Sequence, residues 1–281
     1  GQALVEGLRL RGVEVVFGIP GVHTIELYRG LAGGGIRHVT PRHEQGAGFM
    51  ADGYARVSGK PGVAFVITGP GITNTITAMA QARADSVPVL VVSGVNRRAT
   101  LGKGFGHLHE LPDQAGMIAT LCPTERVEDP AQLSAALDRA FARMANGRPG
   151  PVHIEIPTDV MGLACPAPVV GATSARPAPP EAALDDAVER LNRAARVAIL
   201  AGGGARGCGA ALAALAERLD APVVMTVNAR GMLHGHALGV PASPSLDAAR
   251  AVVAGADLVL ALGTELGPTE YDMYQRGGFP D

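Results

Sequence analysis

Residues 42–56 read RHEQGAGFMADGYAR and directly follow a short run with strand character at 36–39. If a helix begins at Glu44, its carboxylate lies near the positive end of the helix dipole, partly desolvated and still hydrogen-bonded. Gly46, Gly48 and Gly53 each cost a helix interior about 1 kcal/mol relative to alanine. We therefore expect something to approach this helix closely. The alternative, a surface Glu44 that only caps the helix, leaves the glycines unexplained.

The same rhythm of a short apolar strand followed by a helix recurs along the chain. Strands are expected at 13–17, 36–39, 63–68, 89–93 and 152–156, and helices at 23–31, 44–57, 73–84 and 131–145. Nearly continuous apolar strands separated by helices are typical of parallel sheets that are covered on both faces. The pattern predicts an α/β fold with a doubly wound parallel sheet.

Residues 165–180 are rich in Pro, Ala, Gly and Ser and lack helical or strand periodicity. We interpret them as a linker between a first domain, 1–164, and a second, 181–281. The second domain has predicted helices at 182–194 and 209–219, and strands at 197–200, 222–226 and 257–262. Because three strands make an incomplete sheet, we expect a truncated Rossmann-like domain.

Two further glycine-rich segments follow predicted strands. Residues 17–21 read FGIPG, and residues 68–74 read TGPGITN. Open parallel sheets bind ligands at the carboxyl ends of their strands. Glycines let a backbone approach a ligand, and Asn74 with its neighbouring backbone could bind a polar heterocycle or a phosphate. The alternative for each segment is an ordinary turn between a strand and a helix.

In this order, the three segments resemble the pyrimidine-binding domain of thiamine-diphosphate enzymes of the acetolactate synthase and 2-oxo acid decarboxylase family. The resemblance spans the whole chain and is stronger over residues 1–160. It implies that thiamine diphosphate is the cofactor and that the active site lies between the subunits of a homodimer or homotetramer. The residues expected around the aminopyrimidine are Ile19, Pro20, Gly21, Glu44, Thr68, Gly69, Pro70 and Asn74.

The resemblance also gives Glu44 a catalytic role. In the family this glutamate hydrogen-bonds N1′ of the aminopyrimidine and thereby promotes removal of the proton from C2 of the thiazolium ring. The resulting carbanion attacks the 2-oxo carbon of the substrate, and the cofactor holds the electrons when carbon dioxide leaves.

The loop at 101–114 reads LGKGFGHLHELPDQ and carries polar side chains among glycines. His107, His109 and Gln114 could transfer protons or bind a carboxylate, although each could equally be a surface residue. Related decarboxylases have histidines here, which makes His109 a catalytic candidate. Glu110 and Asp113 are candidate partners for a substrate guanidinium, which prefers the paired oxygens of a carboxylate.

Three segments, 17–22, 39–59 and 101–114, are most similar to 5-guanidino-2-oxopentanoate decarboxylase. The resemblance thus implies decarboxylation of a 2-oxo acid, with 5-guanidino-2-oxopentanoate as the leading substrate. An acetolactate-synthase-like carboligase shares the motifs of the first half and is the main alternative. Acetolactate synthases more often have Phe-Gln-Glu where this chain has Leu-His-Glu at 108–110, which counts against that alternative.

In the second domain, residues 202–207 read GGGARG and fit the pattern G-x-G-x-x-G. A non-catalytic nucleotide-binding protein is therefore an alternative from another class. NAD binding requires an acidic residue about 20 positions later, where this chain has Thr-Val-Asn at 226–228. FAD is not expected, because residues 239–243 lack the Gly-Met-His-Gly segment of FAD-containing synthases. No Gly-Asp-Gly motif occurs, so the ligands for Mg²⁺ are expected in a C-terminal domain that these residues do not include.

The composition excludes several classes of partner. The chain has 281 residues, a net charge of −2 and only 18% charged residues, without a basic run. Nucleic acid is therefore a poor candidate partner, and no apolar stretch reaches the ~18 residues of a membrane span. The three cysteines are widely separated, as expected for reduced thiols in a cytoplasmic protein.

Overall fold

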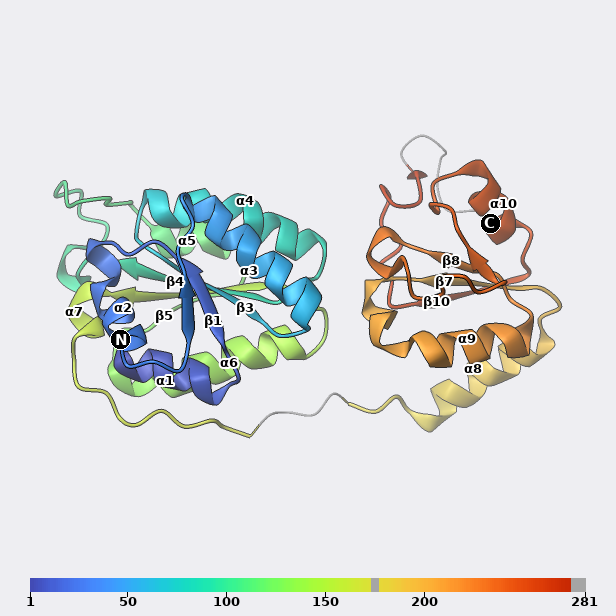
Figure 1. Cartoon of the computed structure of the whole chain (residues 1–281), viewed down its shortest axis with the longest axis horizontal. Coiled ribbons are helices and arrows are strands. Elements are labelled where there is room, and N and C mark those ends of the chain that lie inside the picture. Colours follow the sequence, from blue (N-terminus) through green and yellow to red (C-terminus); the bar gives the residue numbers. More distant parts are fainter. Residues whose placement is uncertain (173–176, 274–281) are drawn as a thin grey trace. The chain divides into compact units, whose positions relative to one another are not determined.

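The computed structural model describes residues 1–172 and 177–273. The chain divides into two compact units, Gly1–Arg176 and Pro177–Asp281 (Figure 1). Each unit contains its own parallel sheet, and the second sheet is the smaller of the two.

The first unit contains a six-stranded sheet in the order β2-β1-β3-β4-β6-β5, in which all neighbouring strands are parallel. Its strands are β1 (Val15–Gly18), β2 (Arg37–Val39), β3 (Gly62–Val66), β4 (Val89–Val95), β5 (Thr124–Arg126) and β6 (Pro151–Pro157). Its helices are α1 (Gln2–Leu10), α2 (Ile25–Leu31), α3 (Glu44–Ser58), α4 (Pro70–Ala84), α5 (Gln114–Ala119), α6 (Leu133–Ala145) and α7 (Thr158–Met161). The predicted doubly wound α/β fold is confirmed.

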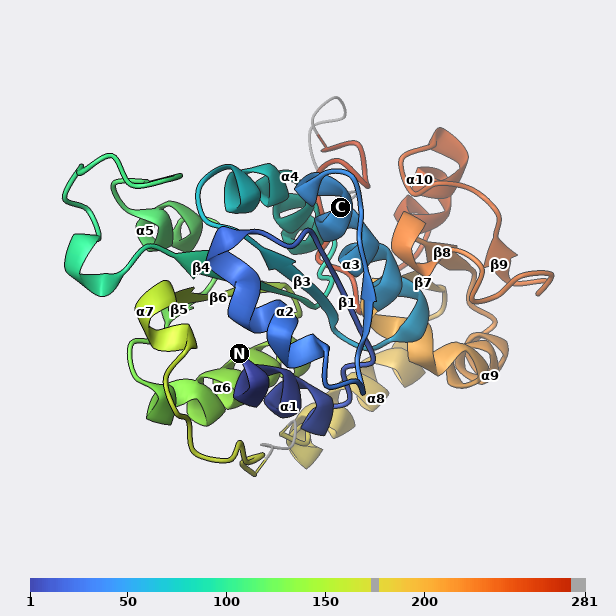
Figure 2. The ribbon, with the colours of Figure 1, turned by 60° about the vertical axis from the view of Figure 1, so that its left-hand side comes forward.

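Alternating side chains of the central strands build two cores, one on each face of the sheet. Val63 and Phe65 of β3 join one core with side chains of α1, α2 and α6. Ala64 and Val66 join the other with α3, α4 and Ile118 of α5. This alternation follows from the two-residue period of a strand. Figures 1 and 2 show the two groups of helices on opposite faces.

Helix α4 begins at Pro70, earlier than the predicted 73. Gly69 precedes it with φ +62°, and proline is favoured at the first helical position because its own φ is already helical. The predicted helix at 23–31 is divided into a 3-10 turn, Val22–Thr24, and α2. Helix α1 and strand β5 were not predicted.

One of the three glycines in α3 accounts for a close contact between helices. A Cβ at Gly48 would lie 2.6 Å from the Cβ of Ala78 in α4, so the expected close approach exists there. A Cβ at Gly46 would make only an ordinary contact, 3.5 Å from Pro41, and a Cβ at Gly53 would meet nothing within 4 Å. The expectation is therefore confirmed at Gly48 and wrong at Gly53.

Part of the predicted linker is bound to the first unit. The backbone carbonyl of Val169 accepts a hydrogen bond of 2.8 Å from Arg11, and the backbone N–H of Gly171 donates to Asp138 at 3.1 Å. Cys165 packs against the core that includes α1 and α6. Residues 165–171 thus follow the surface of the first unit and are not a free tether.

The second unit contains a four-stranded parallel sheet in the order β10-β7-β8-β9. The strands are β7 (Val197–Ala201), β8 (Val223–Met225), β9 (Gly239–Val240) and β10 (Leu258–Leu262), and the helices are α8 (Glu181–Arg193), α9 (Gly209–Leu219) and α10 (Asp247–Ala254). The prediction of three strands was wrong by one, because β9 has only two residues and no apolar run marks it.

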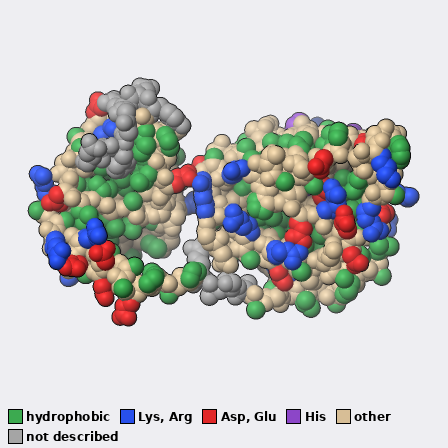
Figure 3. Space-filling view, turned by 180° about the vertical axis from the view of Figure 1, so that it is seen from behind, with side chains coloured by type: hydrophobic (Ala, Val, Ile, Leu, Met, Phe, Trp, Pro, Cys, Tyr) green, Lys and Arg blue, Asp and Glu red, His purple; other side chains and the backbone are tan. Residues whose placement is uncertain are grey.

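The surface agrees with the low net charge. On the face in Figure 3, lysine and arginine side chains lie interspersed with aspartate and glutamate. Within the two ranges that the structure describes, every helix is too short or too polar to cross a bilayer.

Candidate active site

Three neighbouring strands end at the same edge of the first sheet. Strands β2, β1 and β3 are adjacent and parallel, so the segments that leave their carboxyl ends emerge side by side. These segments contain Ile19 to Gly21 after β1, Glu44 after β2, and Thr68 to Asn74 after β3. The three motifs that were far apart in the sequence therefore meet at one edge, where open α/β sheets bind ligands.

Glu44 is the first residue of α3 and is half-buried. Asn74 of α4 donates a hydrogen bond of 3.3 Å from Nδ2 to Glu44 Oε2. Oε1 has no hydrogen-bond donor among the residues that the structure describes. Glu44 also affects Tyr28, because burial and then the carboxylate charge raise the pKa of the Tyr28 phenol. The carboxylate is thus held through one oxygen and available through the other.

The turn between β3 and α4 is fixed by a glycine and by the loop beside it. Gly69 has φ +62°, in the left-handed region that favours glycine. A Cβ there would lie 2.6 Å from the carbonyl oxygen of His109. Pro70 follows at the exposed start of α4, and Thr68 is buried behind the turn. The close packing brings the backbone of the loop at 101–113 against the turn.

Gln114 lies behind this turn and is only 2% exposed. Its Oε1 accepts hydrogen bonds from Thr68 Oγ1 at 2.6 Å and from the Gly69 N–H at 3.1 Å. Its Nε2 lies within hydrogen-bonding distance of Ser93 Oγ, the Gly94 carbonyl and Glu155 Oε2, at 3.0–3.1 Å. Gln114 therefore supports the turn from inside the protein and is not the accessible loop residue that was expected.

The buried network continues from Gln114 to a charged pair. Glu155 is fully buried and also accepts a hydrogen bond from Arg126 Nε, which compensates its charge. His153, two residues away on β6, is fully buried and bonded to Ser93 Oγ at 2.8 Å. Burial, and then the charge of Arg126, lower the pKa of His153 to about 3, so its ring is neutral at pH 7.

The two acidic residues of the loop already have partners. Both oxygens of Glu110 accept backbone N–H donors, from Gly104 at 2.8 Å and from His107 at 3.0 Å. Desolvation opposes ionisation of Glu110, but the backbone hydrogen bonds outweigh it and lower the pKa. Asp113 Oδ1 accepts from the Gly116 N–H at 2.8 Å and caps α5. In this structure neither carboxylate presents two unoccupied oxygens to a guanidinium.

The loop histidines occupy different environments. His107 is exposed, whereas His109 is half-buried with φ +57°, an uncommon conformation for a residue other than glycine. The His109 ring lies 6.0 Å from the ring of His23. Asn96 connects the two regions, because its Oδ1 lies 3.1 Å from His23 Nε2 and its Nδ2 donates to the Leu108 carbonyl at 3.3 Å.

His23 and Asn96 were not predicted as site residues. His23 follows the Gly-Ile-Pro-Gly turn closely, and Asn96 follows β4 at the same edge of the sheet, which is the signal that could have identified them. His23 Nδ1 is buried without a hydrogen-bond partner among the described residues. Burial is the main cause that lowers the pKa of His23, and it favours the neutral ring.

This arrangement fits the pyrimidine end of the expected cofactor. The unpaired Glu44 oxygen and the Asn74 amide provide hydrogen-bonding groups beside glycine-rich turns, which suits a polar heterocycle. Charged phosphates with a metal ion need a different site. Residues 1–172 and 177–273 contain no group of three or more His, Cys, Asp or Glu side chains that could hold a metal ion.

Close backbone packing accounts for part of the glycine motif of the second unit. A Cβ at Gly202 would overlap the carbonyl of Gly263, and a Cβ at Gly204 would lie 3.0 Å from the Cα of Gly263. The backbone at Gly263 thus excludes a side chain at Gly202 and leaves little room for one at Gly204, whereas Gly207 has open space around it.

Comparison with known protein families assigns both units. Residues 1–117 match the N-terminal TPP binding domain of thiamine pyrophosphate enzymes, and residues 184–280 match the central domain of the same enzymes. The chain belongs to the thiamine pyrophosphate enzymes. The expected resemblance is thereby confirmed, and the edge that carries Glu44 lies within the residues that match the N-terminal TPP binding domain.

Three curated relatives of this thiamine pyrophosphate enzyme carry names of two kinds, a decarboxylase and acetolactate synthases. The chain is 54% identical over 276 residues to the probable 2-ketoarginine decarboxylase AruI of Pseudomonas aeruginosa, which covers 96% of this chain and 49% of the relative. It is 35% identical over 269 residues to the acetolactate synthase isozyme 1 large subunit of Escherichia coli, in an alignment that covers 93% of this chain and 48% of the relative. It is 34% identical over 274 residues to the chloroplastic acetolactate synthase of Arabidopsis thaliana, in an alignment that covers 92% of this chain and 40% of the relative. The chain spans about half the length of the relatives it matches or less.

Proposed function

We propose that the whole protein is a thiamine-diphosphate-dependent lyase that decarboxylates a 2-oxo acid, and that 5-guanidino-2-oxopentanoate is its substrate. The observation that carries the proposal is the half-buried Glu44 carboxylate, held by Asn74 through one oxygen and open at the other. The substrate rests on the relative named as a 2-ketoarginine decarboxylase, because 2-ketoarginine is 5-guanidino-2-oxopentanoate.

In this mechanism the side chains at the sheet edge hold and move protons. With the cofactor bound, Glu44 Oε1 would share a proton with a ring nitrogen of the aminopyrimidine, and the Asn74 amide would fix the direction of the carboxylate. The residues that would border the ring are Ile19, Pro20, Gly21, Gly69 and Pro70. When bound, thiamine diphosphate supplies the electron sink for the bond that breaks as carbon dioxide leaves.

We assign His109 to the substrate side of the site. Its backbone lies against the Gly69 turn, and its ring lies near the neutral, buried His23. A histidine there can donate a proton to the substrate or bind its carboxylate. We propose no guanidinium-binding role for Glu110 or Asp113, because both oxygens of Glu110 and Oδ1 of Asp113 already accept backbone hydrogen bonds.

The remaining features of the active enzyme are also proposals. We expect Mg²⁺ and the diphosphate to be held by residues outside 1–281, since no Gly-Asp-Gly motif occurs in this sequence. We expect no bound flavin, so the purified protein should lack a flavin absorption band. The separated cysteines favour a cytoplasmic location.

A homodimer or homotetramer is supported by apolar side chains around the candidate site. Val22 and Ile25, which follow β1, are 67% and 52% exposed, and Phe49 and Met50 of α3 are 42% and 41% exposed. Large apolar side chains gathered on a surface favour an interface between proteins. Light scattering of the whole protein tests this, and a monomer would contradict it.

The test of the proposed function is a substrate comparison on the whole protein with thiamine diphosphate and Mg²⁺. Carbon dioxide release should be faster from 5-guanidino-2-oxopentanoate than from pyruvate. A preference for pyruvate, with acetolactate as product, would instead establish the carboligase that the acetolactate synthase relatives suggest.

A further inference from the structure

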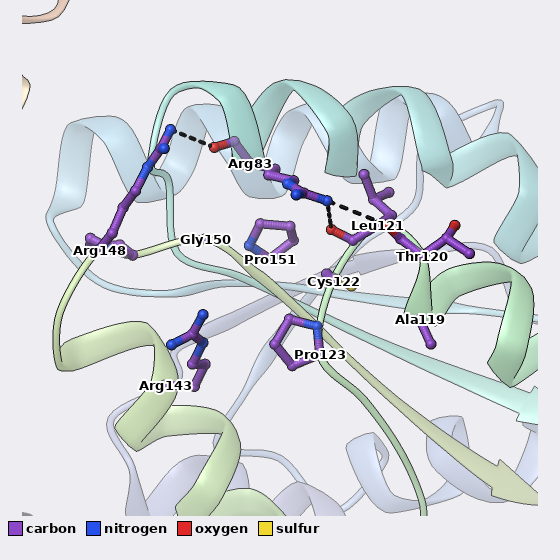
Figure 4. Close-up of a pocket in the computed structure, with 11 residues that line it drawn as sticks. Arg83, Ala119, Thr120, Leu121, Cys122, Pro123, Arg143, Arg148, Gly150 and Pro151 are labelled. Carbon is purple, nitrogen blue, oxygen red and sulfur yellow. Dashed lines mark hydrogen bonds between the residues drawn. The ribbon is translucent and has the colours of Figure 1, made fainter. Parts of the chain in front are cut away.

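A hollow lies in the first unit, at the edge of the sheet where β5 and β6 begin (Figure 4). The strands of this sheet are parallel, so this edge is opposite the one that carries Glu44. The hollow has a volume of about 420 Å³, within the usual range for small-molecule sites. It is lined by Arg83, Ala119, Thr120, Leu121, Cys122, Pro123, Arg143, Arg148, Pro149, Gly150 and Pro151.

The lining contains three arginines and no acidic residue. Arg83 donates from Nη1 to the carbonyls of Thr120 and Leu121, at 3.4 and 2.6 Å, which leaves its Nε and Nη2 without an acceptor among the described residues. Arg143 makes no hydrogen bond or ion pair within the described part of the chain. The guanidinium groups of Arg83 and Arg143 thus keep N–H donors without acceptors, and a positive charge without an acidic neighbour in the lining, at one hollow.

Arg148 is held in place at the rim. Its Nε donates to Ser86 Oγ at 2.8 Å, and its Nη2 donates to the carbonyls of Arg83 and Ala84 at 3.2 and 3.0 Å. Figure 4 shows this guanidinium and that of Arg83 anchored to backbone oxygens, while Arg143 extends toward Gly150 and Pro151. The dipole at a helix C-terminus favours a nearby arginine. It does not account for three arginines around one hollow.

We propose that this hollow binds a small molecule that carries a phosphate group. The guanidinium fork matches phosphate oxygens and forms strong charge-assisted hydrogen bonds with them. Leu121, Pro123 and Pro151 provide apolar surface for the organic part of the ligand. The adjacent Cys122 does not add a competing negative charge, because burial raises the pKa of its thiol to about 12.

The experiment is a calorimetric titration of the chain with inorganic pyrophosphate in the absence of Mg²⁺ and thiamine diphosphate. The variant is Arg143→Met, which removes a charge that makes no hydrogen bond or ion pair in the described structure. The matched control is Arg218→Met, another exposed arginine without a described partner, in the second unit. We expect Arg143→Met to weaken binding about tenfold, or about 1.4 kcal/mol, and Arg218→Met to leave it unchanged.

Three results would overturn the proposal. Pyrophosphate could show no saturable binding, or both variants could weaken it equally, which would indicate nonspecific attraction. Citrate could bind as tightly as pyrophosphate, which would mean that the hollow accepts any multivalent anion. Neither Arg143 nor Arg218 belongs to the proposed catalytic site, so these outcomes are independent of the decarboxylase assignment.

Discussion

Two glycines in α3 provide a matched pair for testing how the candidate site is held together. Gly48→Ala would place a Cβ 2.6 Å from the Cβ of Ala78 and 3.0 Å from Cγ2 of Thr75, both in α4. Ala78 is 2% exposed and has no room to move away. Gly53→Ala would place the same methyl group in open space on the same helix.

The two substitutions should change stability in opposite directions. Both gain about 0.5–1 kcal/mol from the preference of helices for alanine. At Gly48 overpacking costs about 1–3 kcal/mol, which leaves a net loss of up to roughly 2.5 kcal/mol, and about 1 kcal/mol at the middle of the two ranges. Because α3 begins at Glu44 and α4 carries Asn74, the shift at Gly48 should also lengthen the hydrogen bond between those two residues.

Differential scanning calorimetry is the suitable assay, because it separates the transitions of the two units. One kcal/mol corresponds to about 2–4 °C in Tm for a domain of this size. Gly48→Ala should lower the Tm of the first unit, and Gly53→Ala should raise it. If Gly48→Ala is as stable as Gly53→Ala, the close packing of α3 against α4 is not as described.

Three further predictions follow from the buried groups and the proposed site. The pKa of His153 falls from 6.5 to about 3 on folding, so stability is complete above pH 6.5 and falls as the pH drops toward 3. Between pH 7 and 5 the free energy of unfolding should fall by about 2 kcal/mol. Urea titrations should show a smaller fall in His153→Gln, and an equal fall would contradict the lowered pKa of His153. Asn74→Ala in the whole protein should lower kcat about 10-fold or more with an unchanged far-UV circular dichroism spectrum, and unchanged kcat would remove Asn74 from the site. Residues 1–281 with the Arg143→Met substitution should bind thiamine diphosphate and Mg²⁺ more weakly than micromolar, about −8 kcal/mol, and micromolar binding by calorimetry would mean that these residues contain a phosphate and metal site other than the hollow at Arg143.

The sequence was most informative where backbone periodicity decides the structure. The β3 and β4 runs are continuous and apolar, so they predicted buried parallel strands, and the segments after β1, β2 and β3 were correctly expected at one edge. Short elements carry too few residues for a periodic signal. The two-residue β9 was not predicted for that reason; β5, with three residues, was also missed, although β2, of the same length, was predicted at 36–39.

The partners of polar side chains could not be read from the sequence. Glu110 was a candidate for substrate binding, but positive φ angles at Gly102, Gly104 and Gly106 accompany a loop that turns its backbone N–H groups onto this carboxylate. Gln114 lies next to Asp113 in sequence, yet one is buried beneath the turn and the other caps α5 at the surface. Tertiary packing decides such differences.

The central claim is that Glu44 activates the cofactor, and the most direct test is Glu44→Gln in the whole protein. The matched control is Glu181→Gln, because Glu181 is also the first residue of a helix but is exposed in the second unit. With thiamine diphosphate and Mg²⁺ present, carbon dioxide release from 5-guanidino-2-oxopentanoate should fall at least about 100-fold in Glu44→Gln, roughly 2.7 kcal/mol of transition-state stabilisation, and be unchanged in Glu181→Gln. Activity of Glu44→Gln within about tenfold of the wild type, or about 1.4 kcal/mol, would contradict the claim.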